Sequence, residues 1–290
     1  MSIVVEKRVA TPDPPPTGIP NPIHDAEGAD DAGYAGALVA GVRTYGWAAH
    51  TIAKALGHSW LASGWVDFSL RRPLFAGEEL TTTVSDPAPG ADGPWPVECI
   101  GRGQGGERVV LDGEAGLGPA PWASQLDPPP PTPGVDPPAV RPTYDLTTIP
   151  FHEPLHPLRV HVTAEAARRL ITDDLGLDID DQRHQGPGPT AVPIPPHYLA
   201  GRMAPLTRHN FTYGPTIHVR SQIQHRAIPR PGQDITVGAR FVDAYARNDH
   251  WYQVLDGLVS GNIDGELALI RHHTIFRPRG TTMPEPIRSS

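Results

Sequence analysis

The sequence places a histidine shortly before a glycine-punctuated apolar segment, an arrangement suited to proton transfer beside backbone amide donors. Asn21-Pro22-Ile23-His24 is followed by Gly33-Tyr34-Ala35-Gly36-Ala37-Leu38-Val39-Ala40-Gly41. Proline fixes the turn, and histidine suits proton transfer near neutral pH. If the apolar segment opens a helix, its first unpaired N–H groups can hold a thioester oxygen. The pattern therefore predicts acyl-thioester chemistry with His24 as the proton-transfer group.

Other residues near this segment are candidates for the same site. Asn21 and Tyr34 join His24 as candidate catalytic residues. The residues expected to contact a substrate lie mainly at two helix starts, one in each half of the chain; they are Gly36, Gly41, Val42, Arg43, Tyr45, Asp67, His197, Tyr198 and Arg202. Arg43 and Tyr45 would need polar partners if they faced inward, because a buried polar group without a hydrogen bond is costly.

These residues resemble the hydratase motif of the MaoC-like acyl-CoA hydratases and dehydratases of the double-hotdog type. That motif has the form Asp-x-Asn-Pro-x-His, followed by Gly-Phe/Tyr-x-Gly-Pro-Ile-x-His-Gly. In this chain Ile19 occupies the aspartate position and Ala40 the later histidine position. The family usually keeps the motif in the second unit, whereas here it lies in the first. Substitute carboxylates for the aspartate could come from Asp25, Glu27, Asp30, Asp31 or Asp67.

The resemblance implies an enzyme that hydrates or dehydrates an acyl thioester or a related small metabolite, with His24 as general acid or base. The same fold could instead catalyse isomerisation, cyclisation or thioester hydrolysis, or form a non-catalytic subunit that binds an acyl chain. The implied partner is a small-molecule substrate carried on coenzyme A or on an acyl-carrier protein. No cofactor is implied.

Composition excludes several other classes of protein. The 290 residues carry a net charge of −8, which disfavours nucleic acid as a partner. The single cysteine, Cys99, cannot form an internal disulfide and suggests a reducing, cytoplasmic setting. We find no apolar run long enough to cross a membrane. A tandem chain of this kind could be a monomer or a homodimer.

Three motif matches do not predict metal or dinucleotide binding. His152-Glu153-Pro154-Leu155-His156 has the letters of a zinc-protease motif, but its prolines forbid the helix that this motif requires. The glycine-rich segment 101–106 lies between two expected strands and opens no helix. The adjacent His272 and His273 lie on an expected strand, where neighbouring side chains point to opposite faces. We therefore expect no metal site.

Proline placement divides the chain into two halves. Of the 36 prolines, a dense group lies around Pro128-Pro129-Pro130-Pro131, which can form neither a helix nor a central strand. The predicted organisation is a Pro-rich arm at 1–16, a first hotdog unit at 17–122, a linker at 123–150, a second unit at 151–280 and a tail at 281–290.

The two halves also repeat each other at one offset. Arg71, Gly77 and Thr81 align with Arg226, Gly232 and Thr236, each 155 residues later (226 − 71 = 155). Each half has one helical segment, 37–56 or 196–207, followed by strand-like runs. The runs are 66–70, 79–85, 96–102 and 108–117 in the first half, and 216–226, 234–245, 251–260 and 267–276 in the second. The pattern, together with the family resemblance, predicts an α+β tandem (double) hotdog fold, each unit a central helix wrapped by a long antiparallel sheet.

Overall fold

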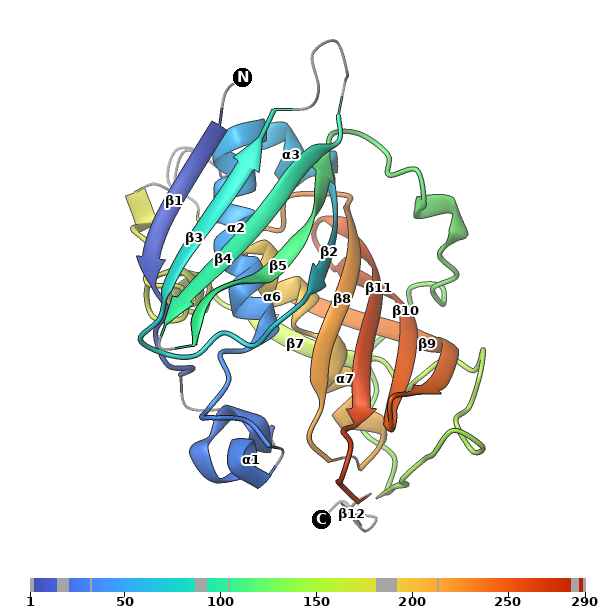
Figure 1. Ribbon diagram of the computed structural model, residues 1–290. Coiled ribbons are helices and arrows are strands. Elements are labelled where there is room, and N and C mark those ends of the chain that lie inside the picture. The colour runs from blue at the N-terminus through green and yellow to red at the C-terminus, as the bar shows by residue number, and fades with distance from the viewer. Residues whose placement is uncertain are drawn as a thin grey trace.

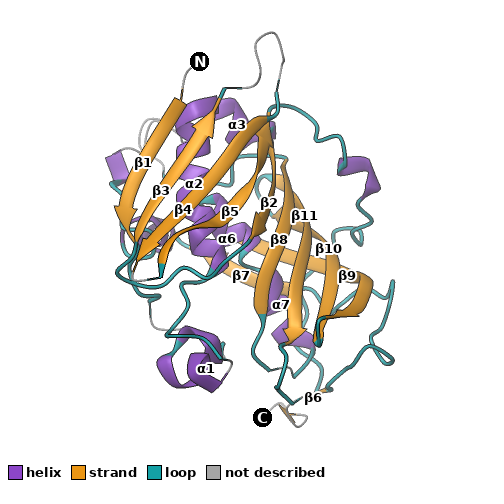
Figure 2. Ribbon diagram, in the orientation of Figure 1, coloured by secondary structure: helices purple, strands orange, loops and turns teal. Residues whose placement is uncertain are grey.

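The protein is built around one ten-stranded antiparallel sheet that wraps around central helices (Figure 1, Figure 2). The computed structural model describes residues 3–14, 21–31, 33–86, 93–103, 105–180, 192–212, 214–282 and 287–288. The strand order is β1-β3-β4-β5-β2-β8-β11-β10-β9-β7. The first five strands come from the first half of the chain and the other five from the second half. The tandem double hotdog fold predicted from the sequence is confirmed.

The first unit wraps five strands around one long helix. Its strands are β1 (Ile3–Val9), β2 (Trp65–Leu70), β3 (Glu79–Ser85), β4 (Trp95–Gly103) and β5 (Gly106–Gly116). Its central helix is α2 (Gly41–Leu56), which α3 (His58–Ser63) follows and which η1 (Pro22–His24) and α1 (Ala26–Asp31) precede. Tyr45, Trp47 and Ile52 of α2 are each at most 1% exposed, so this helix is a core element rather than a surface one.

The second unit repeats this plan with a shorter, interrupted central helix. Its strands are β7 (Leu158–Val162), β8 (Ile217–His225), β9 (Gln233–Arg247), β10 (His250–Gly261) and β11 (Gly265–Arg277). Its central helices are α6 (Pro196–Ala200) and α7 (Met203–Asn210), with α4 (Ala164–Thr172) outside them. Short elements complete the described chain: η2 (Ala123–Gln125), and β6 (Val140–Arg141) paired with β12 (Ile287–Arg288).

The repeat extends beyond the residues that suggested it. Strand β1 begins at Ile3 and strand β7 at Leu158, again 155 residues apart (158 − 3 = 155). Helix α2 begins at Gly41 and helix α6 at Pro196, with the same offset (196 − 41 = 155). The two five-stranded halves therefore also have the same strand order, each running from its first strand at an outer edge to its second strand at the centre.

The two units join through backbone hydrogen bonds between β2 and β8. The strands pair antiparallel from Trp65 opposite Gln224 to Ser69 opposite Arg220. On the outer face, Arg220 donates two hydrogen bonds across this seam to the carboxylate of Asp67, at 2.9 and 2.7 Å. Because the sheet continues across the seam, the two units form a single rigid support for anything bound beneath it.

Two segments contain more structure than the sequence indicated. Residues 3–9, inside the predicted Pro-rich arm, form the edge strand β1, which pairs with β3 and alternates exposed and half-buried side chains. Within the predicted linker, Tyr144 is buried in the second unit against Phe211, Phe241 and Phe276. Prolines prevent this linker from joining a central strand, but they do not prevent it from packing along the sheet.

None of the helices in the described part of the chain is long and apolar enough to cross a membrane.

Candidate active site

His24 is held at the end of η1 by its ring nitrogen Nδ1. This nitrogen lies 2.8 Å from the carbonyl oxygen of Leu38 and 3.1 Å from Oδ2 of Asp13. A carbonyl oxygen can only accept a hydrogen bond, so we assign the proton of the neutral ring to Nδ1. The other nitrogen, Nε2, then carries the lone pair. His24 is therefore oriented as a base through Nε2.

Asp13 is the carboxylate that sequence reasoning missed. Besides His24, it accepts hydrogen bonds from the amide of Ala40 at 3.0 Å and from Nη1 of Arg43 at 2.9 Å. Burial acts to raise the pKa of Asp13, but the hydrogen bonds from His24, Arg43 and Ala40 outweigh it, and the pKa lies below its ordinary value. Asp13 thus stays ionised behind the imidazole. Ile19, the residue at the family's aspartate position, lies outside the described residues.

The carboxylates that the sequence offered as substitutes are placed elsewhere. Asp25 accepts a hydrogen bond from the amide of Gly28, at the start of α1, and is exposed. Glu27 and Asp30 are exposed on α1, and the side chain of Asp31 lies outside the described part. Asp67 is committed to Arg220 on the outer face of the sheet. The carboxylate at His24 comes instead from the segment that follows β1.

Asn21 ties the histidine turn to the second unit. Its side chain donates from Nδ2 to the carbonyl of Thr216 at 2.8 Å and accepts at Oδ1 from the amide of Thr216 at 3.2 Å. The same Nδ2 lies 3.3 Å from Nε2 of His24. Asn21, expected from the sequence to be a catalytic residue, thus also fixes the histidine turn to a residue 195 positions away.

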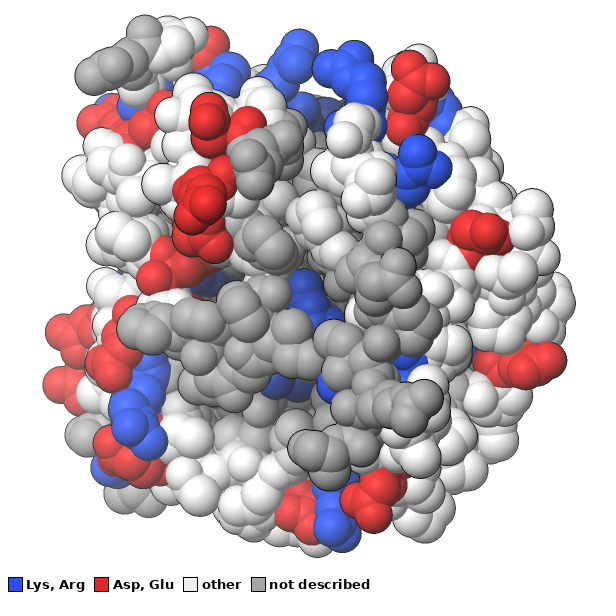
Figure 3. Space-filling view, turned by 90° about the horizontal axis from the view of Figure 1, so that it is seen from below, with Lys and Arg blue, Asp and Glu red and all other residues white. Residues whose placement is uncertain are grey.

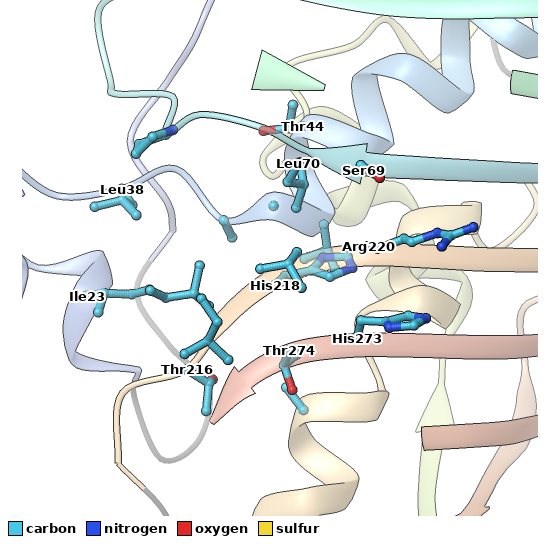
Figure 4. Close-up of a pocket in the computed structure, with 18 of the residues that line it drawn as sticks. Ile23, Leu38, Thr44, Ser69, Leu70, Thr216, His218, Arg220, His273 and Thr274 are labelled. Atoms are coloured by element: carbon cyan, nitrogen blue, oxygen red, sulfur yellow. The ribbon is translucent and has the colours of Figure 1, made fainter. Parts of the chain in front are cut away.

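A cavity of about 930 Å³ lies between the two units beside His24. The first unit contributes Asn21, His24, Tyr34, Gly41 and Val42 to its wall, among others. The second unit contributes residues of β8 and β11, several of which Figure 4 labels, including His218 and Thr274. Five of the residues predicted to form the site are thus brought to one cavity.

The start of α2 provides amide donors at this cavity. Ala40 caps the helix without a side-chain hydrogen bond. Among the described groups, the amides of Gly41 and Val42 have no acceptor, and both residues line the cavity. Unpaired N–H groups at a helix start, together with the positive end of the helix dipole, favour an oxygen that carries negative charge. The geometry therefore fits a thioester oxygen at this point.

Arg43 and His197 belong to a buried ion-pair network behind the cavity, not to its wall. Arg43 bridges Asp13 to Asp174, with its Nε 2.8 Å from Oδ1 of Asp174. The carboxylate of Asp174 also lies 3.0 Å from Nε2 of His197. Both Arg43 and His197 are 3% exposed. Arg43 contacts Asp13 and so helps to fix the pair of His24 and Asp13, but neither Arg43 nor His197 lines the cavity.

The remaining predicted site residues also lie away from the cavity wall. Tyr45 is buried and stacks on Phe68 with ring centroids 4.7 Å apart. Arg202 lies over the ring of Tyr198, 4.1 Å from its centroid. Gly36 and Asp67 are likewise not part of the wall. Direct substrate contact by Tyr45, Tyr198, Arg202, Gly36 and Asp67, as expected from the sequence, is not supported by these positions.

Cations lie at the mouth of the cavity despite the acidic composition of the chain. Arg72, Arg247 and Arg279 line it, are exposed, and form no ion pair with the described residues. Arg247 lies at the tip of the β9–β10 hairpin, whose turn residues Asn248 and Asp249 have positive φ values. Viewed from below, Lys or Arg side chains are visible near the middle of this face of the molecule (Figure 3). The mouth is therefore suited to an anionic group.

Comparison with known proteins supports the fold and leaves the reaction open. No family model matches the sequence, and no curated protein sequence matches it. Among solved structures, a protein from Chloroflexus aurantiacus assigned as a MaoC-domain dehydratase is similar at a TM-score of 0.60 and 13% identity, covering 96% of this chain and 95% of its own. The double-hotdog protein RV0216 from Mycobacterium tuberculosis is similar at a TM-score of 0.55 and 18% identity, covering 85% of this chain and 84% of its own. A protein from Novosphingobium aromaticivorans assigned as a thioesterase is similar at a TM-score of 0.50 and 14% identity, covering 94% of this chain and 96% of its own.

These similarities confirm the MaoC-like double-hotdog resemblance at the level of the fold. At such identities, a shared fold does not transfer a reaction, because function depends on the residues of the site. The neighbours also differ among themselves, since both dehydratases and thioesterases share this architecture. The reaction therefore depends on the chemistry of His24, Asp13 and the cavity.

Proposed function

We propose that this protein hydrates or dehydrates an acyl thioester, with His24 as both general base and general acid. The observation that carries the proposal is the pairing of His24 with the ionised Asp13 at a cavity that also receives the free amides of α2. In this arrangement Asp13 fixes the tautomer of His24 and stabilises the imidazolium that forms during proton transfer. The carboxylate thus supports the base from behind and does not itself need to touch water.

A single imidazole is sufficient for the proposed addition. Nε2 of His24 takes a proton from water as the hydroxyl oxygen bonds to the β-carbon of an α,β-unsaturated thioester. The electrons of the double bond move to the α-carbon and the thioester oxygen, where the amides of Gly41 and Val42 stabilise the negative charge. The imidazolium then returns the proton to the α-carbon. The product is a 3-hydroxyacyl thioester, and dehydration is the same path reversed.

The mouth of the cavity supports a phosphorylated carrier for this thioester. Coenzyme A and the prosthetic arm of acyl-carrier proteins both place phosphate at a distance from the thioester. Arg72, Arg247 and Arg279 are exposed cations without an ion-pair partner among the described residues. Arginine binds phosphate through several directed hydrogen bonds. The proposed substrate therefore enters with its acyl end first and leaves its phosphate at these residues.

Thioester hydrolysis is the second candidate, and one observation favours it. The described residues that line the cavity include no aspartate or glutamate. Hydrolysis needs one base to activate water and an oxyanion site, because a thiolate leaves without an acid catalyst. His24 and the start of α2 could supply both if water were directed at the carbonyl carbon instead of the β-carbon.

One assay separates these reactions. Purified protein is incubated with enoyl, 3-hydroxyacyl and saturated acyl thioesters of coenzyme A, while the enoyl absorbance and the release of free thiol are followed together. Interconversion of the enoyl and 3-hydroxyacyl thioesters without release of free thiol supports the proposal. Release of free thiol supports hydrolysis. His24→Ala should abolish the activity, whereas His161→Ala, on the distant edge strand β7, should retain it. Wild-type protein active in neither assay would indicate a non-catalytic subunit.

A further inference from the structure

The second unit contributes a buried polar chain to the cavity that the proposed reaction does not use. Nε2 of His218 lies 2.8 Å from Oγ of Ser221, which lies 3.0 Å from Nδ1 of His272. Ser221 is fully buried and His272 is 3% exposed. His218, His272 and Thr274 line the cavity, and Figure 4 labels His218 and Thr274. Side chains of this kind are unexpected in a cavity for plain hydrocarbon.

A β-bulge brings these side chains to one face of the sheet. On β11, His273 pairs with Arg220 of β8, but the next residue, Thr274, pairs with His218, so Val219 is an extra residue on β8. An extra residue rotates the strand and re-aims the side chains beyond it. His218 and Ser221 can therefore both point inward although they are three residues apart. The bulge positions His218 next to Thr274.

Two atoms of this group are buried without a hydrogen-bond partner among the described residues. They are Nδ1 of His218 and Oγ1 of Thr274. A Cβ built on Gly41 would lie 3.2 Å from the same Nδ1, so this nitrogen is close to the start of α2. Buried polar atoms are usually satisfied by protein, water or ligand. The adjacent pair therefore needs a polar group that occupies the cavity.

Both histidine rings are neutral at neutral pH, so each has one donor and one acceptor. Burial lowers the pKa of His218 to about 3 and brings that of His272 well below its ordinary value. The hydroxyl of Ser221 can donate to either ring and accept from the other. Nδ1 of His218 can thus be a donor or an acceptor without any charge being created. The pair of His218 and Thr274 can therefore bind either a hydroxyl or a carbonyl oxygen.

We propose that His218 and Thr274 bind an oxygen on the acyl chain, which makes the substrates hydroxy- or ketoacyl thioesters rather than plain hydrocarbon thioesters. This inference rests on the proposed acyl-thioester ligand. The first unit already provides partners for the thioester oxygen, at Gly41 and Val42, and for the water activated by His24. The pair on the wall of the second unit therefore binds a third oxygen. Its closeness to Gly41 places that oxygen on one of the first few carbons.

Binding of analogues that cannot be hydrolysed tests this proposal. The probes are coenzyme A ketones in which CH2 replaces the thioester sulfur, carrying a butyryl chain or its 2-, 3- or 4-hydroxy derivative. Kd is measured by calorimetry, and the 3-hydroxy analogue, which the proposed reaction would dehydrate, is measured on the His24→Ala variant. We expect the 2- or 4-hydroxy analogue to bind at least about tenfold more tightly than the butyryl analogue, because a site built for an oxygen discriminates against its absence. Equal Kd values, or no binding of any analogue, would overturn the proposal.

Matched variants locate the discrimination. Thr274→Val keeps the shape of the side chain, removes the hydroxyl and should bring the hydroxy and butyryl Kd values within about twofold of each other. Thr82→Val makes the same change at a buried strand position outside the cavity and should leave the preference intact. Ser221→Ala tests a positioning residue: the affinity for the butyryl analogue should persist while the preference falls. If Thr274→Val and Thr82→Val show the same preference for the hydroxy analogues, His218 and Thr274 do not bind the oxygen of the acyl chain.

The outcome is independent of the reaction proposed for His24. A preference for the hydroxy analogue by protein that turns over no thioester would sustain this inference and refute the proposed function. Turnover of a thioester by protein that shows no preference for a hydroxy analogue would support the proposed function and refute this inference. A preference confined to the 3-hydroxy analogue would contradict the inference, because it would mean that the pair holds only the hydroxyl formed by hydration.

Discussion

Oδ2 of Asp13 lies 3.1 Å from Nδ1 of His24, so a carboxylate supports the imidazole at the wall of the cavity. The carboxylate comes from the segment after β1 and is itself fixed by Arg43 and by the amide of Ala40. The pair of His24 and Asp13 is therefore anchored both to the edge of the sheet and to the start of the helix whose first residues line the cavity. A shift of either element would change the position of the imidazole.

Replacing Asp13 tests this relationship. Asp13→Asn keeps the size of the side chain but removes the charge that stabilises the imidazolium, and we expect kcat to fall by about 10²-fold or more. Because Arg43 also loses part of its partner, kcat should be normalised to the folded fraction measured by circular dichroism. Asp25→Asn is the matched control, since Asp25 adjoins His24 in sequence but caps α1. Equal kcat values for the two variants would remove Asp13 from the mechanism.

Gly41 should tolerate no side chain. A Cβ at this position would lie 2.3 Å from Cδ1 of Leu70 and 3.2 Å from Nδ1 of His218. Leu70 lines the cavity, and its displacement by the new methyl group would change the cavity wall. Gly41→Ala should therefore raise KM or lower kcat by roughly tenfold or more and cost about 1–3 kcal/mol of stability. Gly105→Ala adds the same methyl group to a hairpin with open space around it and should change neither. Unaltered kinetics in Gly41→Ala would contradict an acyl site at the start of α2.

The arginines at the mouth should govern substrate binding and not the chemical step. We expect the triple variant Arg72→Ala, Arg247→Ala, Arg279→Ala to raise KM for a coenzyme A thioester by about tenfold, with kcat within about twofold of wild type. Added salt should raise the wild-type KM toward that of the variant, because exposed charges are screened. Arg102→Ala, on the β4–β5 hairpin, where Arg102 pairs with Glu107, is the control. A variant whose KM keeps the salt dependence of wild type would exclude these residues from carrier binding.

Buried neutral histidines should make the protein acid-sensitive. Burial lowers the pKa of His225 to about 4 and that of His273 to about 4, from the ordinary 6.5. Between pH 4 and pH 6.5 these histidines bind protons in the unfolded chain but not in the folded chain. The free energy of unfolding therefore falls as the pH drops from about 6.5 toward 4. Each such group contributes a slope of up to about 1.4 kcal/mol per pH unit.

His225→Phe isolates one of these groups. Its ring packs edge-on against Trp60, with centroids 4.7 Å apart, and its buried Nε2 has no partner among the described residues, so phenylalanine should fit. Urea unfolding measured from pH 8 to pH 4 should show unchanged or higher stability at pH 8 and a slope about 1.4 kcal/mol per pH unit shallower below 6.5. Parallel curves for the variant and the wild type would show that His225 does not titrate on unfolding.

Strand and helix positions were largely predictable because their signals are local. The alternation in residues 79–85 matches the register of β3 opposite β4, and the constant offset of 155 residues, as between Arg71 and Arg226, indicated the duplication. Strand β1 was missed because Ile3–Val9 is followed closely by prolines, which suggested an arm. Its pairing with β3 is a contact between distant segments, for which a single sequence contains no signal.

The site was predictable only where its residues are close in sequence. Asn21, His24, Tyr34 and Gly41 could be grouped because they share one segment. Asp13 reaches His24 through the path of the chain after β1, and nothing in its Pro-rich surroundings distinguishes it from a surface aspartate. His218 and Thr274 meet through a bulge, and the regular alternation assumed for strands cannot indicate which residue a bulge will re-aim.

The presence of both units in one chain, joined at the seam between β2 and β8, has an evolutionary consequence. When a protein of this shape assembles from two identical chains, every substitution appears twice and both crevices change together. Here a covalent connection frees each half from the other, so a base can be kept in one and lost in its counterpart, which can then specialise in selecting what the base acts upon.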